Sequence, residues 1–328
     1  MPELDFVHIV ASAARTHSLE CKVEDTTISI ETTDPEGFLS ALSHDPRFSD
    51  FQLKSILVLV KNETSALNFD MFRDVRALYY YRNITSTNDV AECLQSRRLE
   101  THFQPLIDLR ADGLYGYEAL TRGLRQDFSL ITPNELFGYA ETHDKVFYLD
   151  RLARETAIRT ASLLKLEGNI FINFMPNAIY DPAQCLRTTF AIAKETHLDR
   201  SRLVFEVVET ERIDDMGHLR SIFEHYRHNG FRVALDDVGS GYSGLNTMLD
   251  LHPDLIKIDR EIVSGIDRDQ MKQSLFRGLI DAARIRDITV IAEGIETEGE
   301  LNFVRAAGAD IAQGYYFARP AKDPVRLV

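Results

Sequence analysis

Polar side chains that can bind a cation or transfer a proton recur at the ends of strand-like segments in this 328-residue chain. Carboxylates, an amide and an amine end one apolar run after another, which is typical of a site shared by several strands. Lys257 and Asp259 are two residues apart and therefore share one face of their strand. The candidates in chain order are Gln104, Glu118, Asn173, Glu206, Glu209, Asp236, Asp237, Lys257, Asp259, Glu293 and Gln313.

Ligand chemistry indicates which cation such a set would hold. Cys and His are absent from these strand ends, so zinc-type ligation is not expected. Carboxylates with one amide oxygen suit Mg²⁺ or Mn²⁺. The adjacent Asp236 and Asp237 could serve two ions, and paired metals about 3.5–4 Å apart suit in-line displacement at phosphorus. Arg122, four residues after Glu118, offers a planar fork for phosphate or guanine. The residues alone therefore predict a metal-dependent phosphoester hydrolase.

Each of these residues also has an ordinary structural interpretation. A glutamate near a strand end is most often a solvated rim residue, and Asp-Asp before Gly is most often a turn or a helix cap. Lys257 could be a buried ion-pair partner, and Asn173 could satisfy backbone groups in a turn. These interpretations fail jointly, because converging carboxylates repel and desolvate one another unless cations offset their charge.

Eight apolar, strand-like runs alternate with helix-length amphipathic segments in the predicted barrel domain, residues 86–328. Eight β/α units predict a closed barrel with its chemistry at the carboxyl ends of the strands. Only a few residues around Ala111–Gly113 join the first two runs, too few for a parallel crossover. The first strand is therefore expected to run antiparallel to the second. The runs are 102–108, 114–120, 169–174, 203–208, 231–236, 254–259, 288–293 and 310–316, and the clearest helical segments are 145–165, 211–229, 267–285 and 296–307.

The pattern of residues 1–85 predicts a separate, small α+β module ahead of the barrel. Glu20–Ile30 alternates like an exposed strand, Asp34–Ser43 has the acidic start of a short helix, and Ser55–Val60 is typical of a buried strand. The polar, turn-like Asn83–Asn88 marks the expected boundary. The module carries no recognisable motif, so a regulatory or dimerising role is a hypothesis from domain arrangement alone.

Composition excludes several classes of protein. The chain has 37 Lys and Arg against 51 Asp and Glu, a formal net charge of −14, which argues against binding a nucleic-acid polymer. With 44% hydrophobic residues it is not disordered. Cys21, Cys93 and Cys185 offer no disulfide framework or metal motif. The longest apolar run, Ile56–Val60, is too short to span a membrane. We therefore expect a soluble, cytoplasmic protein.

The glycine-rich segment Val238–Gly244 follows Asp237 directly. It lacks Gly-Lys-Ser/Thr and is therefore not a P-loop for nucleoside triphosphates. Three interpretations stay open: a flexible barrel loop, a tight turn beside the metal ligands, or a movable lid.

Taken in order, these motifs resemble the EAL family of cyclic di-GMP phosphodiesterases. The signature tripeptide is Glu118-Ala119-Leu120, and the match covers about residues 89–320. The resemblance implies an α/β fold, a modified (β/α)8 TIM-like barrel with an antiparallel first strand. It also implies hydrolysis of cyclic di-GMP to linear pGpG with Mg²⁺ or Mn²⁺, in a homodimer formed through the barrel. The matching segments are 103–108, 117–122, 172–174, 205–210, 235–243, 256–260, 292–296 and 312–316.

The same resemblance implies a role for each site residue. Two metal ions would be bound, the second by Asp236 and Asp237 and the first by Glu118, Asn173, Glu206 and Asp236. Glu293 would be the general base or a further ligand, and Lys257 would position the attacking water or stabilise charge. Glu209 would anchor the loop after the fifth strand, and Glu296 would support the site. Substrate binding would involve Gln104, Leu120, Arg122, Asp259 and Gln313.

The chain departs from the family pattern in the glycine-rich segment. Val238, Ser240 and Gly244 stand where the family commonly has Phe, Thr and Ser. Valine buries less area, and the added glycine increases loop freedom near the usual dimer contact. None of the expected metal ligands is lost. Their retention weighs against two alternatives, a catalytically silent cyclic di-GMP receptor and a protein-binding regulator.

Overall fold

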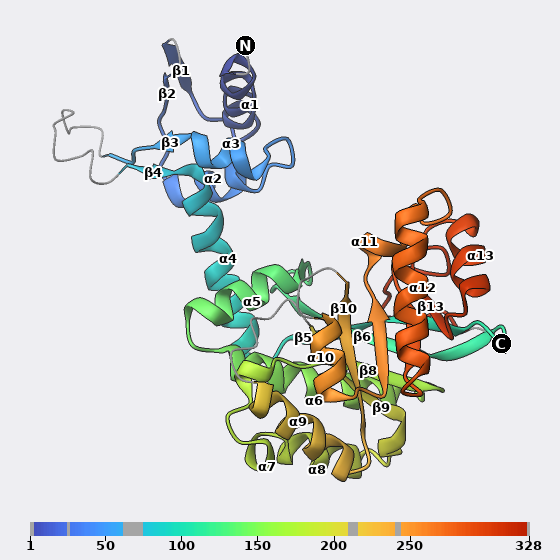
Figure 1. Cartoon of the computed structure of the whole chain (residues 1–328). Helices are drawn as coiled ribbons and strands as arrows, with labels where there is room; N and C mark the ends of the chain where they lie inside the picture. Colours follow the sequence, from blue (N-terminus) through green and yellow to red (C-terminus); the bar gives the residue numbers. More distant parts are fainter. Residues whose placement is uncertain (1–2, 25–26, 62–74, 209–215, 240–243, 327–328) are drawn as a thin grey trace. The chain divides into compact units, whose positions relative to one another are not determined.

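The computed structural model describes residues 3–24, 27–61, 75–208, 216–239 and 244–326 and divides into two compact units, Met1–Glu92 and Cys93–Val328. The division falls inside one helix, α4 (Leu78–Gln95) (Figure 1). The prediction of a turn at Asn83–Asn88 was wrong, because the helix runs through it. That segment has neither Gly nor Pro, and a helix that has already begun is extended at little cost.

The first unit is a small α+β fold, as predicted. Asp34 caps α2 by accepting the N–H of Gly37 at 2.9 Å. The expected buried strand at Ser55–Val60 was wrong: only β3 pairs there, and its Leu57 is 71% exposed. The elements are α1 (Glu3–Thr16), β1 (Cys21–Glu24), β2 (Thr27–Ile30), α2 (Pro35–Ser43), α3 (Asp50–Ser55), β3 (Leu57–Val58) and β4 (Arg76–Ala77).

Eight strands of the second unit close into a barrel, as predicted. β5 pairs antiparallel with both β6 and β13, and the remaining neighbours in the barrel are parallel. The expected hairpin between the first two strands is thus confirmed. The barrel strands are β5 (Leu99–Asp108), β6 (Gly113–Leu124), β8 (Asn169–Asn173), β9 (Leu203–Val208), β10 (Arg232–Val238), β11 (Leu255–Ile258), β12 (Thr289–Ala292) and β13 (Ile311–Gln313). A short strand, β7 (Leu130–Ile131), pairs with β6 outside the barrel order.

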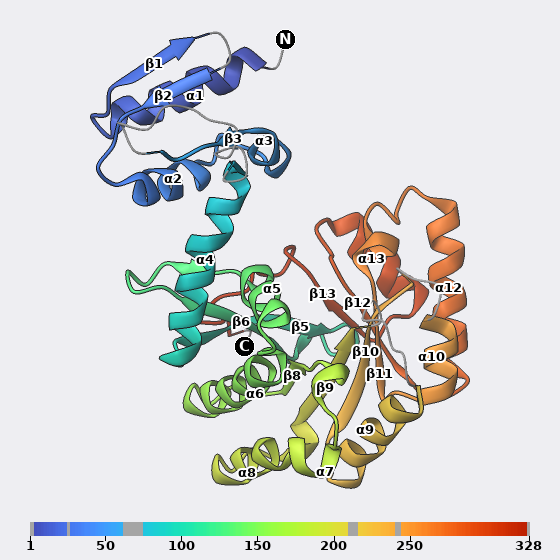
Figure 2. The same ribbon diagram turned by 90° about the vertical axis from the view of Figure 1, so that its left-hand side faces the viewer.

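Helices connect the parallel strands of the barrel and lie outside it, as α6, α8 and α9 do in Figure 2. All four predicted helical segments contain a helix, α6, α9, α12 and α13, although residues 211–215 of the second segment lie outside the described residues. None of the described helices is long and apolar enough to span a membrane. The helices are α5 (Pro133–Thr142), α6 (Val146–Leu163), α7 (Pro182–Cys185), α8 (Arg187–Glu195), α9 (Met216–His228), α10 (Gly244–Leu251), α11 (Arg260–Val263), α12 (Gln270–Arg284) and α13 (Glu298–Ala307).

The barrel strands have two buried faces. Because side chains alternate along a strand, one set faces the barrel axis and the other packs against the helices. The helix-facing set joins a large core with residues such as Ile158 of α6 and Phe276 of α12. The axis-facing set forms a closed hydrophobic layer across the barrel, made of Leu106, Phe171, Val204, Ala234, Leu255, Ile291 and Ile311.

A buried ion pair fixes α6 to the loop after β8. Asp150 and Arg154 form a salt bridge one helical turn apart, and both side chains are almost wholly buried. The other carboxylate oxygen of Asp150 accepts the backbone N–H of Met175 at 3.0 Å. Met175 lies two residues after Asn173, so the pair holds the segment that leaves β8.

Asp150→Asn should destabilise the barrel strongly. The variant keeps an acceptor for Met175 but leaves the Arg154 guanidinium buried without its counter-ion, which costs about 3 kcal/mol. Calorimetry of the full chain should show the barrel transition lowered by about 6–12 °C.

The exposed pair Arg159–Glu195 is the matched control for Asp150→Asn. Glu195→Gln should change the free energy of unfolding by no more than about 0.5 kcal/mol. Equal shifts for the two variants would contradict the role given to the buried pair.

Candidate metal centre and active site

The predicted site residues form one layer at the mouth of the barrel. On the seven barrel strands other than β6, the site residue lies two positions from the axis-facing apolar residue, so the pleat turns both toward the axis. Phe171 is thus followed by Asn173, and Val204 by Glu206. The reversed strand β5 obeys the same rule, because Gln104 lies directly opposite Glu118 in register. The layer comprises Gln104, Glu118, Asn173, Glu206, Asp236, Lys257, Glu293 and Gln313.

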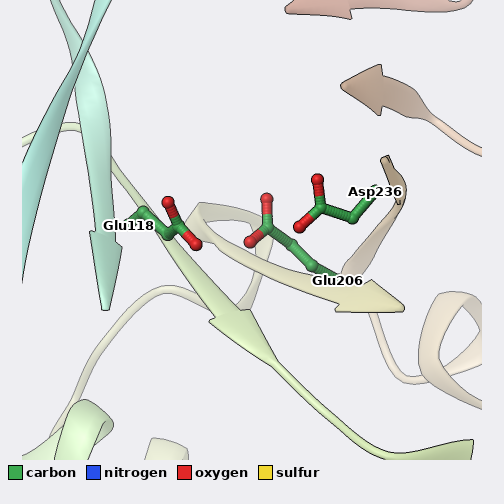
Figure 3. Close-up of side chains that lie close together, drawn as sticks. All are labelled: Glu118, Glu206 and Asp236. Atoms are coloured by element: carbon green, nitrogen blue, oxygen red, sulfur yellow. The ribbon is translucent and has the colours of Figure 1, made fainter. Parts of the chain in front are cut away.

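Three carboxylates converge at the centre of this layer. Glu118 of β6, Glu206 of β9 and Asp236 of β10 point toward one another in Figure 3, and one oxygen of each lies within 4.8 Å of the others. Neither carboxylate oxygen of Glu206 has a hydrogen-bond partner, although Glu206 is fully buried. Buried carboxylates without partners are costly. A hard divalent cation suits this all-oxygen set, so the three residues fit a metal ion.

A β-bulge creates a second group of carboxylates. The register of β10 against β11 passes from Leu235–Ile256 to Val238–Ile258, so β10 has one residue more than its partner. The extra step falls at Asp236 and Asp237, and Asp237 adopts a left-handed φ of 55°. Two adjacent carboxylates can therefore lie on one side of the strand. Asp236, Asp237 and Glu293 form the second group with oxygens within 4.8 Å.

Lys257 of β11 neutralises part of this charge. Its ammonium group lies 2.7 Å from Glu293, 3.1 Å from Asp236, 3.3 Å from Glu206 and 3.7 Å from Glu118. The lysine side chain is 1% exposed. The interpretation of Lys257 as a buried ion-pair partner is confirmed, and it is compatible with the predicted site role because its partners are the candidate ligands themselves.

Amide side chains orient Glu118. Asn173 Nδ2 donates to one of its oxygens at 3.2 Å, and Gln313 Nε2 donates to the other at 2.6 Å. Gln313 also donates to Gln104, which in turn donates to the backbone carbonyl of Ala318 at 3.1 Å. Gln313 therefore orients a candidate metal ligand by hydrogen bonding, and Gln104 in turn orients Gln313.

Crowding makes these groups hard to ionise. Burial raises the pKa of Glu206 and of Glu293 well above the usual range, and it also raises the pKa of Asp236. Neighbouring carboxylates add to the effect of burial. Burial and the Asp236 charge raise the pKa of Asp237 to about 7. Burial alone would lower the pKa of Lys257, but the surrounding carboxylates raise it well above its usual value. The lysine therefore stays charged while the carboxylates compete for protons.

The other predicted site residues lie around this centre. Leu120 and Arg122 follow Glu118 at the spacing of one strand face, and both are half-buried. Asp259 caps α11 and also contacts the Asp237 carboxyl. Glu296 forms an exposed ion pair with Arg260 at 2.9 Å. Glu209 and residues 240–243 of the glycine-rich segment lie outside the described residues.

Two contributors were missed by the sequence analysis. The carbonyl of Ala318 receives the bond from Gln104, and a backbone group has no sequence signature. Arg260 follows the Lys257–Asp259 motif directly, and its stem packs against Gly294, where an added Cβ would meet it at 2.4 Å. The sequence signal for Arg260 is its place in segment 256–260, which resembles the family pattern.

The chain belongs to the EAL domain family, whose model matches residues 87–320. Two curated relatives are similar over this region. They are the "Probable cyclic di-GMP phosphodiesterase PdeG" of Escherichia coli K12, 29% identical over 76% of this chain and 50% of its own, and the "Cyclic di-GMP phosphodiesterase RocR" of Pseudomonas aeruginosa, 28% identical over 73% and 62%. The chain thus spans about half the length of the first and under two thirds of the second.

Solved structures give the same family. A c-di-GMP-bound standalone versatile EAL protein from Vibrio cholerae O395 is 35% identical and has a TM-score of 0.64, covering 70% of this chain and 95% of its own. A calcium and cyclic di-GMP complex of Klebsiella pneumoniae BlrP1 is 27% identical and has a TM-score of 0.63, covering 70% and 57%. The predicted fold and family are confirmed.

Cation binding should strengthen as pH rises. The raised pKa values mean that the metal-free site holds protons that a cation must displace, and Asp237, with a pKa of about 7, is the group that titrates within the range tested. Mn²⁺ affinity, measured by calorimetry in buffers of different ionisation enthalpy, should increase between about pH 6 and 8 with about one proton released.

Asp237→Asn should bind Mn²⁺ more weakly but with a flatter dependence on pH, because the carboxyl whose pKa is about 7 is gone. An affinity of the parent chain that does not vary with pH would contradict this account of the site.

Proposed function

We propose that the barrel hydrolyses cyclic di-GMP to linear pGpG with the help of two divalent cations, Mg²⁺ or Mn²⁺. The observation that carries the proposal is the pair of carboxylate groups sharing Asp236, one with Glu118 and Glu206 and the other with Asp237 and Glu293. Asn173, whose Nδ2 donates to Glu118 at 3.2 Å, is the proposed amide ligand of the first group and would bind through its oxygen after the amide turns over. Bound cations would polarise the phosphodiester and neutralise charge that develops on its oxygens.

Lys257 and Glu293 supply the proton chemistry in this proposal. The Lys257 ammonium group holds Glu293 at 2.7 Å and stays charged, so it can orient an attacking water and stabilise negative charge. Glu293 has two oxygens, one facing Lys257 and one available to the second cation group or to the proton of the water. Glu209 keeps its proposed role as an anchor of the following loop.

The residues proposed to bind the substrate include those that follow Glu118 on the same face of β6. Arg122 donates to the carbonyl of Thr121 through one nitrogen, and its planar group can bind a phosphate or a guanine edge. Leu120 offers an apolar contact between Glu118 and Arg122. Gln104 and Gln313 act behind Glu118, Asp259 acts beside Asp237, and Glu296 supports the loop after β12.

The comparisons support this activity. Curated relatives are named as cyclic di-GMP phosphodiesterases, and the similar Vibrio cholerae structure holds c-di-GMP. The Klebsiella pneumoniae complex holds calcium together with the dinucleotide. A silent receptor remains the competing function, and a hydrolysis assay separates the two.

Purified full chain should convert cyclic di-GMP to pGpG in Mg²⁺ or Mn²⁺ and not in chelator. Glu118→Ala should lower the rate at least about 10²-fold, because it removes a ligand of the first group. Its thermal stability without metal should be preserved, since one of several repelling carboxylates is lost. Chromatographic detection of pGpG measures the rates.

Glu167→Ala, which removes an exposed carboxylate just before β8, is the control and should leave the rate unchanged. A Glu118→Ala rate equal to that of the parent chain would mean that the assigned metal centre is wrong. Bound nucleotide without product in the parent chain would favour the receptor.

We further propose that residues 1–85 form a regulatory or dimerisation module and that the barrel itself forms the homodimer. The first unit has its own core, which includes Val10, Phe38 and Leu53. Residues 86–328 should keep the hydrolysis chemistry while differing from the full chain in rate or in oligomeric state. Light scattering and the pGpG assay compare the two, and identical behaviour would contradict the module's role. The cytoplasmic setting also stays a proposal, consistent with three free cysteines.

A further inference from the structure

Glu300, in the first turn of α13, is a buried carboxylate that lies outside the metal groups. It is 4% exposed. One of its oxygens accepts the backbone N–H groups of Glu296 and Thr297, each at 2.9 Å. The other accepts the N–H of Gly265 at 2.8 Å. Gly265 belongs to the connection between α11 and α12, so the side chain joins two separate segments.

This arrangement goes beyond an ordinary helix cap. Three capping boxes occur in the part of the chain that the structure describes, at α3, α5 and α13. In α5, Glu135 bonds Thr132 of its own box and the side chain of Arg125. Glu135 is only partly buried. Among the three boxes, only that of α13 ties its cap to the backbone of another connection.

The two joined segments carry site residues. The segment that contains Gly265 follows Lys257 at the end of β11, and the segment capped by Glu300 begins with Glu293 at the end of β12. Glu293 donates its N–H to the Ile258 carbonyl at 3.1 Å, and Ile295 donates to Gln313 at 3.0 Å. Between them Gly294 takes a φ of 70°, which makes the turn.

We propose that Glu300 is a positioning residue that fixes the Glu293 carboxylate beside Lys257 and in the second carboxylate group. It does so by clamping the segment after β12 to the segment after β11. The consequence for metal binding rests on the proposed function, whereas the consequence for the geometry of Glu293 does not.

Only a carboxylate serves all three donors. Burial would raise the pKa of Glu300, but the backbone N–H groups of Gly265, Glu296 and Thr297 lower it below the usual value, so the group stays an acceptor. A glutamine would have to present its NH₂ to one side. The cap could then survive only by giving up the bond to Gly265.

The test is Glu300→Gln in the full chain. In metal-free protein, amide exchange at Gly265, Glu293 and Ile295 should speed up about tenfold or more, because a bond to a charged acceptor is lost. Mn²⁺ should bind about 10-fold more weakly, as is typical when a group behind a ligand is removed. Saturating Mn²⁺ should restore most of the hydrolysis rate.

Two control variants separate clamping from capping. Thr297→Ala removes the bond from Glu300 N–H to the Thr297 hydroxyl but leaves Gly265 bonded. It should lower the Tm by about 2–4 °C and change Mn²⁺ affinity less than about twofold. Glu135→Gln makes the same chemical change in the cap of α5 and should leave Mn²⁺ affinity and exchange at Glu293 unchanged.

A substitution at Gly265, the donor of the bond to Glu300, provides a second test. Gly265 has a φ of 70° with open space around it, so Gly265→Ala disturbs the turn without a clash. It should reproduce the effects of Glu300→Gln. If both variants leave exchange at Glu293 and Mn²⁺ affinity as in the parent chain, the proposal is overturned. Exchange and metal binding need no substrate, so a failure of the hydrolysis proposal would be seen separately.

Discussion

The buried ammonium group of Lys257 is the interaction on which the mouth of the barrel depends. Four carboxylates lie within 4 Å of it, including the fully buried Glu206. Removing charges from water is costly, and like charges at this distance add to the cost. The lysine holds the group together without satisfying it, because both oxygens of Glu206 still lack a hydrogen bond. A cation bound between the carboxylates would offset their remaining negative charge and supply a partner for the Glu206 oxygens, so the site fits a cation.

Strand register delivers these groups to one layer. Below them, Leu106, Phe171 and Val204 belong to a buried apolar layer across the barrel axis. The side-chain period of two then turns the next residue of each strand into the layer above. A one-residue slip of any strand would exchange its polar group for a helix-facing apolar residue. The apolar layer therefore sets the geometry of the polar one.

The sequence predicted those features that follow from periodicity and loop length. The short connection at Ala111–Gly113 predicted the antiparallel β5, and polar residues at strand ends predicted the layer around Lys257. The polar composition of Asn83–Asn88 wrongly predicted a turn, because α4 continues through this segment without interruption. The prediction of a buried strand at Ser55–Val60 was wrong because an apolar run does not show whether other elements will cover it.

The finer geometry depends on backbone events that residue types do not record. Simple alternation would turn Asp237 away from Asp236, and only the bulge with its left-handed φ returns it to the same side. The Ala318 carbonyl and the bond from Gly265 to Glu300 are likewise backbone contacts between distant segments. The positions of Asp237, Gln104 and Glu300 thus depend on backbone geometry that residue types alone do not predict.

Charge counting supports the proposal of two cations rather than one. The two groups contain five carboxylates, Glu118, Glu206, Asp236, Asp237 and Glu293, and Lys257 offsets one of their charges, leaving 5 − 1 = 4 negative charges when all are ionised. One divalent cation would leave two, which would repel an approaching phosphodiester. Two would neutralise the set, so an anionic substrate could enter a barrel mouth in a chain of net charge −14. In the proposed two-cation site, the bulge that brings Asp237 into the second group would therefore allow the acidic layer to accept an acidic ligand.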